Sequence, residues 1–411
     1  MREGAVTRDE ARAMDAVDPL RGVRDRFTLP EGVIYLDGNS LGALPTATPA
    51  RVAQTVEREW GEGLIRSWND AGWIDAPARV AAGIAPLIGA RADEVVVADS
   101  TSINLYKLLM AALAARPGRH VILTEPGNFP TDLYMAQGIA AGADVDVRAV
   151  PRDRIIEAID DSVAVVMLTH VHYRTAEMFD MATVTAAAHR AGALMLWDLS
   201  HSAGAVPVDL DGAGADLAVG CGYKYLNGGP GAPAFLYVAE RHRALLTSPL
   251  TGWMGHVAPF TFGDDYAPCA TMRRWLCGTP PILGLAALEA GIATFDGVDR
   301  AALFAKGQAL ADLFVAEVEA RCPSLTLASP RDAARRGSHI SFAHDDAFPV
   351  MAALIDRGVI GDFRAPDLLR FGFTPLYTSF DDVWRAADIL ADVLDSGAWN
   401  DPRYRARGAV T

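Results

Sequence analysis

The stretch LMLWDLSHSAGAVPVDLDGAGADLAVGCGYKYLNGGPG, residues 194–231, decides the fold. It contains two short β-forming runs, Ala193–Asp198 and Asp216–Gly220, that are apolar almost throughout. Such runs are typical of strands buried on both faces of a parallel sheet. Asp198 ends the first run, and Lys224 follows just past the end of the second. Because α/β proteins bind ligands beyond the C-terminal ends of their strands, these two residues are the first candidates for a functional site.

The same alternation of strand and helix signals extends over much of the chain. Further strands are expected at Glu94–Ala98, His120–Thr124 and Val163–Thr169, and helices at Ala50–Trp60, Asn104–Ala115 and Met181–Ala191. This order predicts a large doubly wound α/β domain with a mixed, mostly parallel sheet. From about residue 285 long helical stretches and a few short strands predict a smaller α+β domain. The first fifty residues are expected to be irregular, because prolines interrupt any long element.

Composition and charge exclude several classes of protein. The 411 residues include 37 basic and 51 acidic side chains, for a net charge of −14. This excess of acid argues against coating nucleic acid or an anionic membrane surface. No apolar run approaches the roughly 18 residues of a membrane span, and the N-terminus has no apolar signal region. We therefore expect a cytoplasmic protein.

The four cysteines, at positions 221, 269, 277 and 322, include no CxxC pair. This spacing fits neither a disulfide framework nor a zinc knuckle, so reduced thiols in or near the core are expected.

Asp198 and Lys224 together indicate pyridoxal phosphate (PLP). This cofactor needs a lysine amine for its Schiff base and a carboxylate that keeps its pyridinium nitrogen protonated. Taken singly, Asp198 reads as a helix N-cap and Lys224 as a solvated loop residue. At two strand ends, and flanked by glycines that allow close backbone approach, the pair favours the cofactor.

Other segments could complete such a site. Residues 99–102, Asp-Ser-Thr-Ser, open a helix, and hydroxyls beside free backbone N–H groups form an anion site, although an ordinary N-cap looks the same. Phe129 could stack on a flat ring or pack in the core. Tyr223 could reach a phosphate oxygen or be a buried tyrosine with a backbone partner. Arg370 could bind a substrate carboxylate through its planar fork, or lie on the surface.

His170 and His172 form an HxH pair. On a strand both would point to one face and could bind a metal with His201 or Asp198. The alternative, in which one histidine lines a pocket and the other packs, is favoured because no HExxH motif or cysteine cluster accompanies the pair. We expect no metal.

Several segments of the chain resemble the kynureninase family. They are YLDGNSLG (35–42), FPTD (129–132), WDLSHSAG (197–204), GYKYLNGGPG (222–231), GWMGH (252–256), PPIL (280–283) and LRFGFTPLYTSF (369–380). The resemblance runs in order from about residue 33 to 395. It implies the type I fold of PLP-dependent transferases, shared with aspartate aminotransferase, and a hydrolase that acts on a C–C bond of a ketonic substrate. The implied reaction converts L-kynurenine to anthranilate and L-alanine.

The resemblance also implies roles for individual residues. Lys224 is the Schiff-base lysine, Asp198 the partner of the pyridinium nitrogen, and Tyr223 a plausible proton carrier. Phe129 stacks on the ring. The cofactor-binding set it implies is Thr101, Ser102, Phe129, Asp132, Thr169, Asp198, His201, Tyr223, Lys224, Trp253 and Thr279.

On the substrate side the resemblance implies Ser40, Trp68 and Arg370, with Arg370 holding the α-carboxylate. Trp253 and Thr279 fall where the family closes its site from the neighbouring subunit, which implies a homodimer with shared active sites. Relatives that prefer 3-hydroxykynurenine have a histidine near position 68 and an asparagine before the Pro-Pro. Trp68 cannot accept a hydrogen bond from a phenol, and Thr279 is shorter than asparagine, so we expect 3-hydroxykynurenine to be the poorer substrate.

The expected organisation has three parts. Residues 1–50 form an N-terminal segment packing with the small domain, residues 51–285 the large PLP-binding domain, and residues 286–411 the small C-terminal domain. Alternatives are a cysteine desulfurase or selenocysteine lyase, which needs a mobile nucleophilic cysteine such as Cys269, and an aminotransferase. A PLP-binding regulator without turnover and a metal-dependent hydrolase are further alternatives. Tryptophan catabolism by the kynurenine pathway, NAD biosynthesis and secondary metabolism remain open as contexts.

Overall fold

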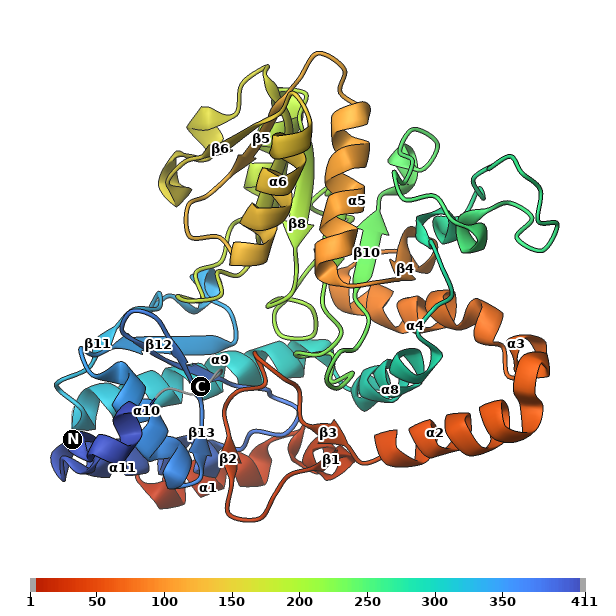
Figure 1. Ribbon diagram of the computed structural model, residues 1–411. Coiled ribbons are helices and arrows are strands. Elements are labelled where there is room, and N and C mark those ends of the chain that lie inside the picture. The colour runs from red at the N-terminus through yellow and green to blue at the C-terminus, as the bar shows by residue number, and fades with distance from the viewer. Residues whose placement is uncertain (1–4, 407–411) are drawn as a thin grey trace. The chain divides into compact units, whose positions relative to one another are not determined.

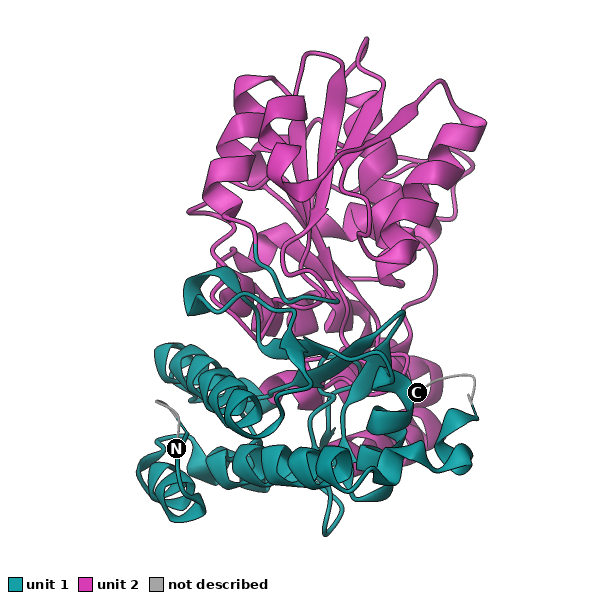
Figure 2. Cartoon of the chain, turned by 90° about the vertical axis from the view of Figure 1, so that its left-hand side faces the viewer, with its two compact units in different colours: residues 1–47, 174–178, 294–411 teal, residues 48–173, 179–293 magenta. Residues whose placement is uncertain are grey.

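The computed structural model describes residues 5–406. Its contacts divide the chain into two compact units (Figure 2). Within the described residues, unit 1 takes in the chain up to residue 47, residues 174–178 and the chain from residue 294 onward. Unit 2 holds residues 48–173 and 179–293.

Unit 2 is built on a seven-stranded sheet with the order β4-β10-β9-β8-β7-β5-β6 (Figure 1). The strands are β4 Val95–Val97, β5 Val121–Thr124, β6 Asp146–Ala149, β7 Val163–Thr169, β8 Leu194–Asp198, β9 Leu217–Gly220 and β10 Phe235–Val238. β10 runs antiparallel to β4 and β9, whereas the remaining pairs are parallel. Every residue of β7, β8 and β9 is buried, as the unbroken apolar runs require. The predicted α/β class with a mixed, mostly parallel sheet is confirmed.

The helices of unit 2 pack on this sheet or beside it. They are α2 Thr48–Gln54, α3 Ser67–Asp70, α4 Ala76–Ile84, α5 Thr101–Ala114, α6 Pro130–Gly142, α7 Met181–Arg190 and α8 Ile282–Ile292. α5 and α6 lie side by side (Figure 1), and α5 packs Leu105, Leu108 and Leu109 into the core that the sheet lines. The helix expected at Ala50–Trp60 is longer and changes its form, because a π-helix, Thr55–Gly63, continues directly from α2.

Unit 1 contains a four-stranded antiparallel sheet with the order β11-β12-β15-β14. Its strands are β11 Thr326–Leu327, β12 His339–Ala343, β14 Asp362–Arg364 and β15 Leu368–Gly372, and its helices are α1 Arg8–Val17, α9 Arg300–Arg321, α10 Ala347–Asp356 and α11 Phe380–Asp395. Two small pairs, β1 Phe27–Thr28 with β3 Leu44–Pro45 and β2 Ile34–Tyr35 with β13 Val359–Ile360, complete it. Phe314 packs against Phe342, Phe371 and Phe373 in its core.

The expectation that the first fifty residues are irregular is wrong for α1. Thr7 and Glu10 form a capping box at its start, and the helix ends at Val17, before Pro19 could interrupt it. Its Arg8 side chain also pairs with Asp381 of α11 at 2.7 Å. The ten residues of α1 fit before Pro19, and the capped start and the packed face stabilise so short a helix.

No helix within residues 5–406 combines the length and the apolar character that crossing a membrane requires.

Candidate active site

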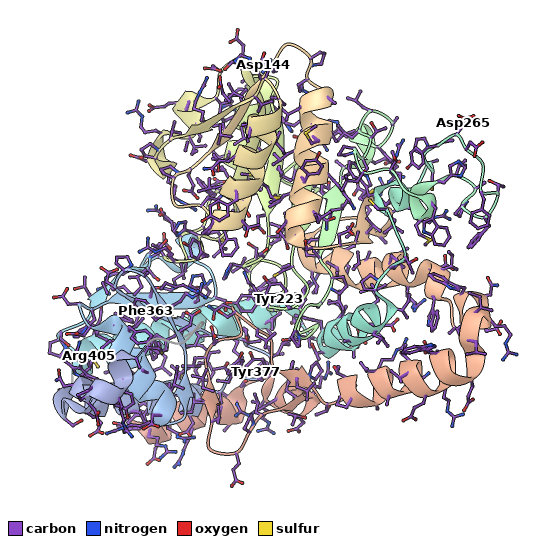
Figure 3. All side chains as sticks on the ribbon, viewed as in Figure 1. Asp144, Tyr223, Asp265, Phe363, Tyr377 and Arg405 are labelled. Carbon is purple, nitrogen blue, oxygen red and sulfur yellow. The ribbon has the colours of Figure 1, made fainter. Side chains whose placement is uncertain are left out.

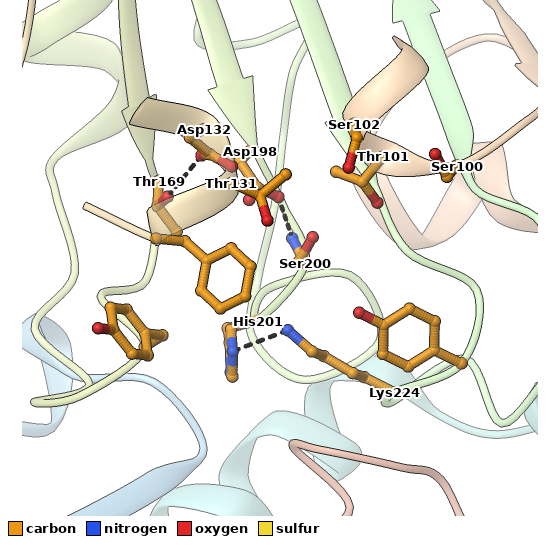
Figure 4. A pocket seen from close by; sticks show the side chains of 13 residues that line it. Ser100, Thr101, Ser102, Thr131, Asp132, Thr169, Asp198, Ser200, His201 and Lys224 are labelled. Atoms are coloured by element: carbon orange, nitrogen blue, oxygen red, sulfur yellow. Dashed lines mark hydrogen bonds between the residues drawn. The ribbon is translucent and has the colours of Figure 1, made fainter. Parts of the chain in front are cut away.

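A cavity in unit 2 opens beyond the C-terminal ends of β7 and β8 and beside the start of α5 (Figure 4). It is lined by Ser100, Thr101, Ser102, Phe129, Thr131, Asp132, Thr169, Tyr173, Asp198, Ser200, His201, Tyr223 and Lys224. Nine of these residues are predicted cofactor ligands. The sequence did not single out Thr131, Tyr173 and Ser200. Thr131 directly precedes the predicted Asp132, and Ser200 directly precedes the predicted His201.

Lys224 lies in the cavity on a tightly coiled loop. Its side chain is buried, and its Nζ is 3.0 Å from His201 Nε2, toward which it points in Figure 4. The Phe129 ring centroid is 5.5 Å from the same nitrogen. The loop closes because the Asn227 N–H donates to the Lys224 carbonyl at 2.9 Å, and the Gly228 N–H donates to the Gly222 carbonyl at 2.9 Å. A Cβ on Gly228 would lie 2.7 Å from that Gly222 oxygen, so this position has no room for a side chain.

Asp198 and Asp132 form a buried pair of carboxyl groups that are hydrogen-bonded to each other. The Ser200 N–H donates to Asp198 Oδ1 at 2.7 Å, and Thr169 Oγ1 donates to Asp132 Oδ2 at 3.3 Å. Burial raises the pKa of both carboxyls, and the neighbouring Asp198 raises that of Asp132 further. The pair therefore favours holding a proton, which we assign to Asp132.

This pair fits a protonated pyridine ring. Two adjacent buried carboxyls form a site that is short of positive charge. Lys224 offsets this only in part: it lowers the pKa of both carboxyls, but burial raises them more. A ring nitrogen carrying a proton would give the Asp198 carboxylate a cationic partner. The nearby aromatic ring of Phe129 offers a flat face for such a ring.

The start of α5 fits a phosphate group. Ser100 is the N-cap, and its Oγ accepts from the Ile103 N–H at 3.4 Å. The Thr101 and Ser102 hydroxyls stand in the first turn and line the cavity (Figure 4), where backbone N–H groups also have no partner within the helix. Burial raises the pKa of the Tyr223 phenol, so this group stays neutral and can donate a hydrogen bond.

The two histidines of the HxH pair do not lie on a strand, because β7 ends at Thr169. His170 Nδ1 is 2.9 Å from Ser202 Oγ, and burial together with Arg152 lowers its pKa to about 4. His172 Nε2 is 3.0 Å from the Gly127 carbonyl. Among the described residues no three His, Cys, Asp or Glu side chains are grouped so that they could hold a metal ion.

Trp68 and Trp253 lie outside this cavity, and both line a second hollow of unit 2 with Phe260 and Phe262. Phe260 and Phe262 are exposed, on the long loop that leads to Asp265, labelled in Figure 3. Thr279 is exposed on the segment before α8.

Arg370 and Ser40 come together in unit 1. Arg370 is 1% exposed, which rules out the surface alternative, and its guanidinium pairs with Asp362 through two nitrogens, of which Nε lies 2.8 Å from Oδ1. Ser40 Oγ accepts from Arg370 Nη2 at 2.9 Å and donates to Asp362 Oδ2 at 2.8 Å. Burial and the charge of Asp362 raise the pKa of the neighbouring Asp37 to about 7. The arginine fork is thus held in one orientation, as recognition of a carboxylate requires.

Comparison with known proteins gives consistent matches. A family model described as the kynureninase C-terminal domain matches residues 303–390. The chain is 55% identical over 415 aligned positions to a kynureninase of Burkholderia mallei (strain SAVP1), with 98% of this chain and 100% of that protein covered. It is 52% identical to a kynureninase of Pseudomonas fluorescens at the same coverage.

Solved structures resemble the fold at low sequence identity. A cysteine desulfurase from Thermococcus onnurineus NA1 matches with a TM-score of 0.78 and 20% identity, covering 91% of this chain and 98% of that one. A variant of C-DES with glycine covalently linked to its PLP cofactor matches with a TM-score of 0.76 and 16% identity, covering 90% and 99%.

Proposed function

The chain belongs to the kynureninase family, and from that membership we propose that it hydrolyses L-kynurenine to anthranilate and L-alanine with PLP as its cofactor. The observation that carries the proposal is the cavity of unit 2, in which Lys224, the carboxyl pair of Asp198 and Asp132, and the hydroxyls at the start of α5 converge. We propose that unit 2 is the large cofactor domain and unit 1 the small domain.

Each part of the cavity would hold one part of the cofactor. The first turn of α5, with Thr101 and Ser102, would bind the phosphate, and Tyr223 would donate to it. Phe129 would stack on the ring, and the Asp198 carboxylate would hold the proton on the ring nitrogen. When bound there, PLP supplies a protonated ring that withdraws electrons from the substrate's Cα.

The chain's own groups then move protons and orient the substrate. The Lys224 amine takes the proton from the substrate Cα, with His201 Nε2 held 3.0 Å from that amine. Arg370, oriented by Asp362 and Ser40, supplies the positive charge that binds the α-carboxylate. Water adds to the γ-carbonyl, the Cβ–Cγ bond breaks, and the acyl half leaves as anthranilate. Delivery of a proton to Cβ, for which we propose the neutral Tyr223 phenol as the acid, and return of the first proton from Lys224 to Cα complete L-alanine.

The desulfurase alternative is not favoured, since the likeness to desulfurases lies at 20% identity and shows the fold alone. That chemistry also needs an accessible thiolate. Cys221, Cys269 and Cys322 are buried, and burial raises the pKa of the Cys221 and Cys277 thiols.

We propose a homodimer in which Trp253 and Thr279 reach the cofactor of the neighbouring subunit. Large apolar side chains stand exposed around the second hollow of unit 2, including Ile65, Phe260 and Phe262. Exposed apolar clusters of this kind mark interaction surfaces. The free cysteines suit the reducing cytoplasm, where we place the enzyme.

We further propose that L-kynurenine is preferred over 3-hydroxykynurenine. Trp68 stacks edge-on against Trp73 at 6.0 Å between centroids and offers an apolar wall rather than an acceptor for a phenol. In a Trp68→His, Thr279→Asn double variant, kcat/KM for 3-hydroxykynurenine relative to L-kynurenine should rise about tenfold, the value of one added hydrogen bond. An unchanged ratio would show that neither position reads the substrate ring.

The cofactor assignment is tested by reducing the PLP-loaded protein with borohydride and mapping the modified lysine by peptide mass spectrometry. Modification of Lys224, together with loss of anthranilate release in Lys224→Ala, is expected. Modification of another lysine, or an active Lys224→Ala protein, would overturn the assignment.

A further inference from the structure

Lysine is rare in this chain, and each lysine is buried. Of the 37 basic residues only Lys107, Lys224 and Lys306 are lysines, and they are 0%, 7% and 8% exposed. A buried ammonium is costly unless it is paired and hydrogen-bonded, so each must have a defined partner. Lys224 lies in the cavity, and Lys306 pairs with Asp18 at 2.7 Å in unit 1. Lys107 has no role in the function proposed above.

The contacts of Lys107 lead to the phosphate end of the cavity. It lies on α5 six residues after Thr101, and its ammonium pairs with the Asp99 carboxylate. Asp99 comes between β4 and Ser100, the N-cap of α5. Side chains on a helix lean toward its N-terminus, which lets Lys107 reach back to the turn that precedes its own helix.

That turn is strained. Asp99 has a φ of +46°, in the left-handed region that side chains other than glycine adopt only at a cost. Its carbonyl accepts from the Ala234 N–H at 2.9 Å, and the preceding Ala98 carbonyl accepts from Asn104 Nδ2 at 2.8 Å. The ion pair with Lys107 adds a constraint on the side chain. Because this turn leads directly into the first turn of α5, its conformation sets the direction in which the phosphate-binding N–H groups point.

The second bond of Lys107 leads to a different segment. Its Nζ donates to the Trp275 carbonyl at 2.6 Å, four residues before Thr279. In the same stretch the Cys277 carbonyl accepts from the Met254 N–H at 3.2 Å, and a Cβ on Gly252 would lie 2.3 Å from that oxygen. The bond from Lys107 therefore restrains the segment around Trp275, which leads to Thr279. Through the contacts of Cys277 it also restrains the segment that carries Trp253.

We propose that Lys107 is a positioning residue that locks the phosphate-binding turn of α5 to the segment 271–279. One ammonium thereby sets both the cradle for this subunit's cofactor and the segment offered to the neighbouring subunit. The inference rests on the proposed function, because the phosphate concerned is that of PLP.

The first test compares PLP with pyridoxal, which lacks the phosphate, in titrations of the apoprotein followed by absorbance. The wild type should bind PLP much more tightly. In Lys107→Met and in Asp99→Asn this preference should fall about tenfold or more, the effect of one lost charge-assisted contact. In Lys306→Met, a matched control that breaks the buried Lys–Asp pair of unit 1, the preference should stay at the wild-type value. A merely structural role would lower the melting temperature of all three without changing this ratio.

The second test separates the two arms of Lys107 by hydrogen exchange of the apoprotein. Amides of residues 271–279 should exchange about tenfold faster in Lys107→Met, because the bond to the Trp275 carbonyl is lost. They should exchange at the wild-type rate in Asp99→Asn, which keeps that bond. If Lys107→Met fails to fold, the Asp99→Asn titration still decides the first arm.

A wild-type preference for PLP in Asp99→Asn or Lys107→Met, or an equal loss in Lys306→Met, would overturn the proposal. A wild-type protein that binds PLP no better than pyridoxal would instead refute the proposed function.

Discussion

Replacing Asp198 and Asp132 separately by asparagine should give opposite results, although the two carboxyls are neighbours in one buried pair. Asp198→Asn removes the negative charge that would hold the proton on the ring nitrogen. Asp132→Asn keeps a neutral group that can donate to Asp198, as the protonated acid does. We expect the first variant to lose turnover and the second to keep most of it.

Burial sets the magnitude for Asp198. Asp198 is 2% exposed, so an effective dielectric of about 20 applies, and a hydrogen-bonded ion pair at about 3 Å is worth about 5 kcal/mol. This corresponds to a factor of about 10⁴ in the equilibrium for protonating the ring nitrogen. In a water-exposed site the same pair would contribute only about tenfold. We therefore expect kcat to fall by about 10³ to 10⁴ in Asp198→Asn and by less than about tenfold in Asp132→Asn.

The assay is anthranilate fluorescence at saturating L-kynurenine, with PLP loading of each variant verified from its absorbance and folding from thermal unfolding. Both variants should remain folded, since burial already disfavours the ionised carboxyl at each position. If Asp132→Asn lost as much activity as Asp198→Asn, the assignment of the proton to Asp132 would be wrong. If Asp198→Asn kept full activity, Asp198 would not be the partner of the ring nitrogen.

Three further predictions concern charged groups outside the cavity. Arg370→Lys should raise KM for L-kynurenine about 100-fold with a smaller change in kcat, because lysine cannot bind a carboxylate through a fork; an unchanged KM would exclude this role. Asp216 is a buried carboxylate paired with His189, His242 and Arg241, and its hydrogen bonds to the two histidines lower its pKa. Asp216→Asn should lower the free energy of unfolding by about 3 kcal/mol at pH 7, and the deficit should shrink below about pH 4, because a lowered pKa stabilises the fold only above the unfolded value. A pH-independent deficit in denaturant melts would contradict this. Asp37 has a pKa raised to about 7, so between about pH 4 and 7 the folded protein holds a proton that the unfolded chain releases, and stability falls as pH rises. Asp37→Asn should abolish that slope and should be more stable than the wild type at pH 8. A variant that is no more stable than the wild type at pH 8 would contradict this account of Asp37.

The sequence predicted those parts of the molecule that depend on local pattern. Asp198 and Lys224 were visible because each follows an unbroken apolar run, and buried parallel strands have that signature. β6 escaped prediction because it is an edge strand with partly exposed polar residues. β10 was also not predicted, although it is as long and as buried as β9, which was predicted. The helix α1 was missed because the prolines after it indicated irregular structure. The capping box at its start is the local signal that identifies the helix.

Features that depend on long-range contacts could not be read from the sequence. Asp132 and Asp198 are 66 positions apart, and only folding makes them share a proton. Arg370 was a candidate for binding a carboxylate, but only its burial against Asp362 and Ser40 excludes the surface alternative. The role inferred for Lys107 likewise required its contact with Trp275, 168 positions away.

The most direct test of the central claim is the product balance of the purified, PLP-loaded protein with L-kynurenine as the sole added substrate. Anthranilate, followed by its fluorescence, and L-alanine should form in equal amounts without any α-keto acid. A protein that takes up PLP but releases no anthranilate, or that requires an α-keto acid, would contradict the account.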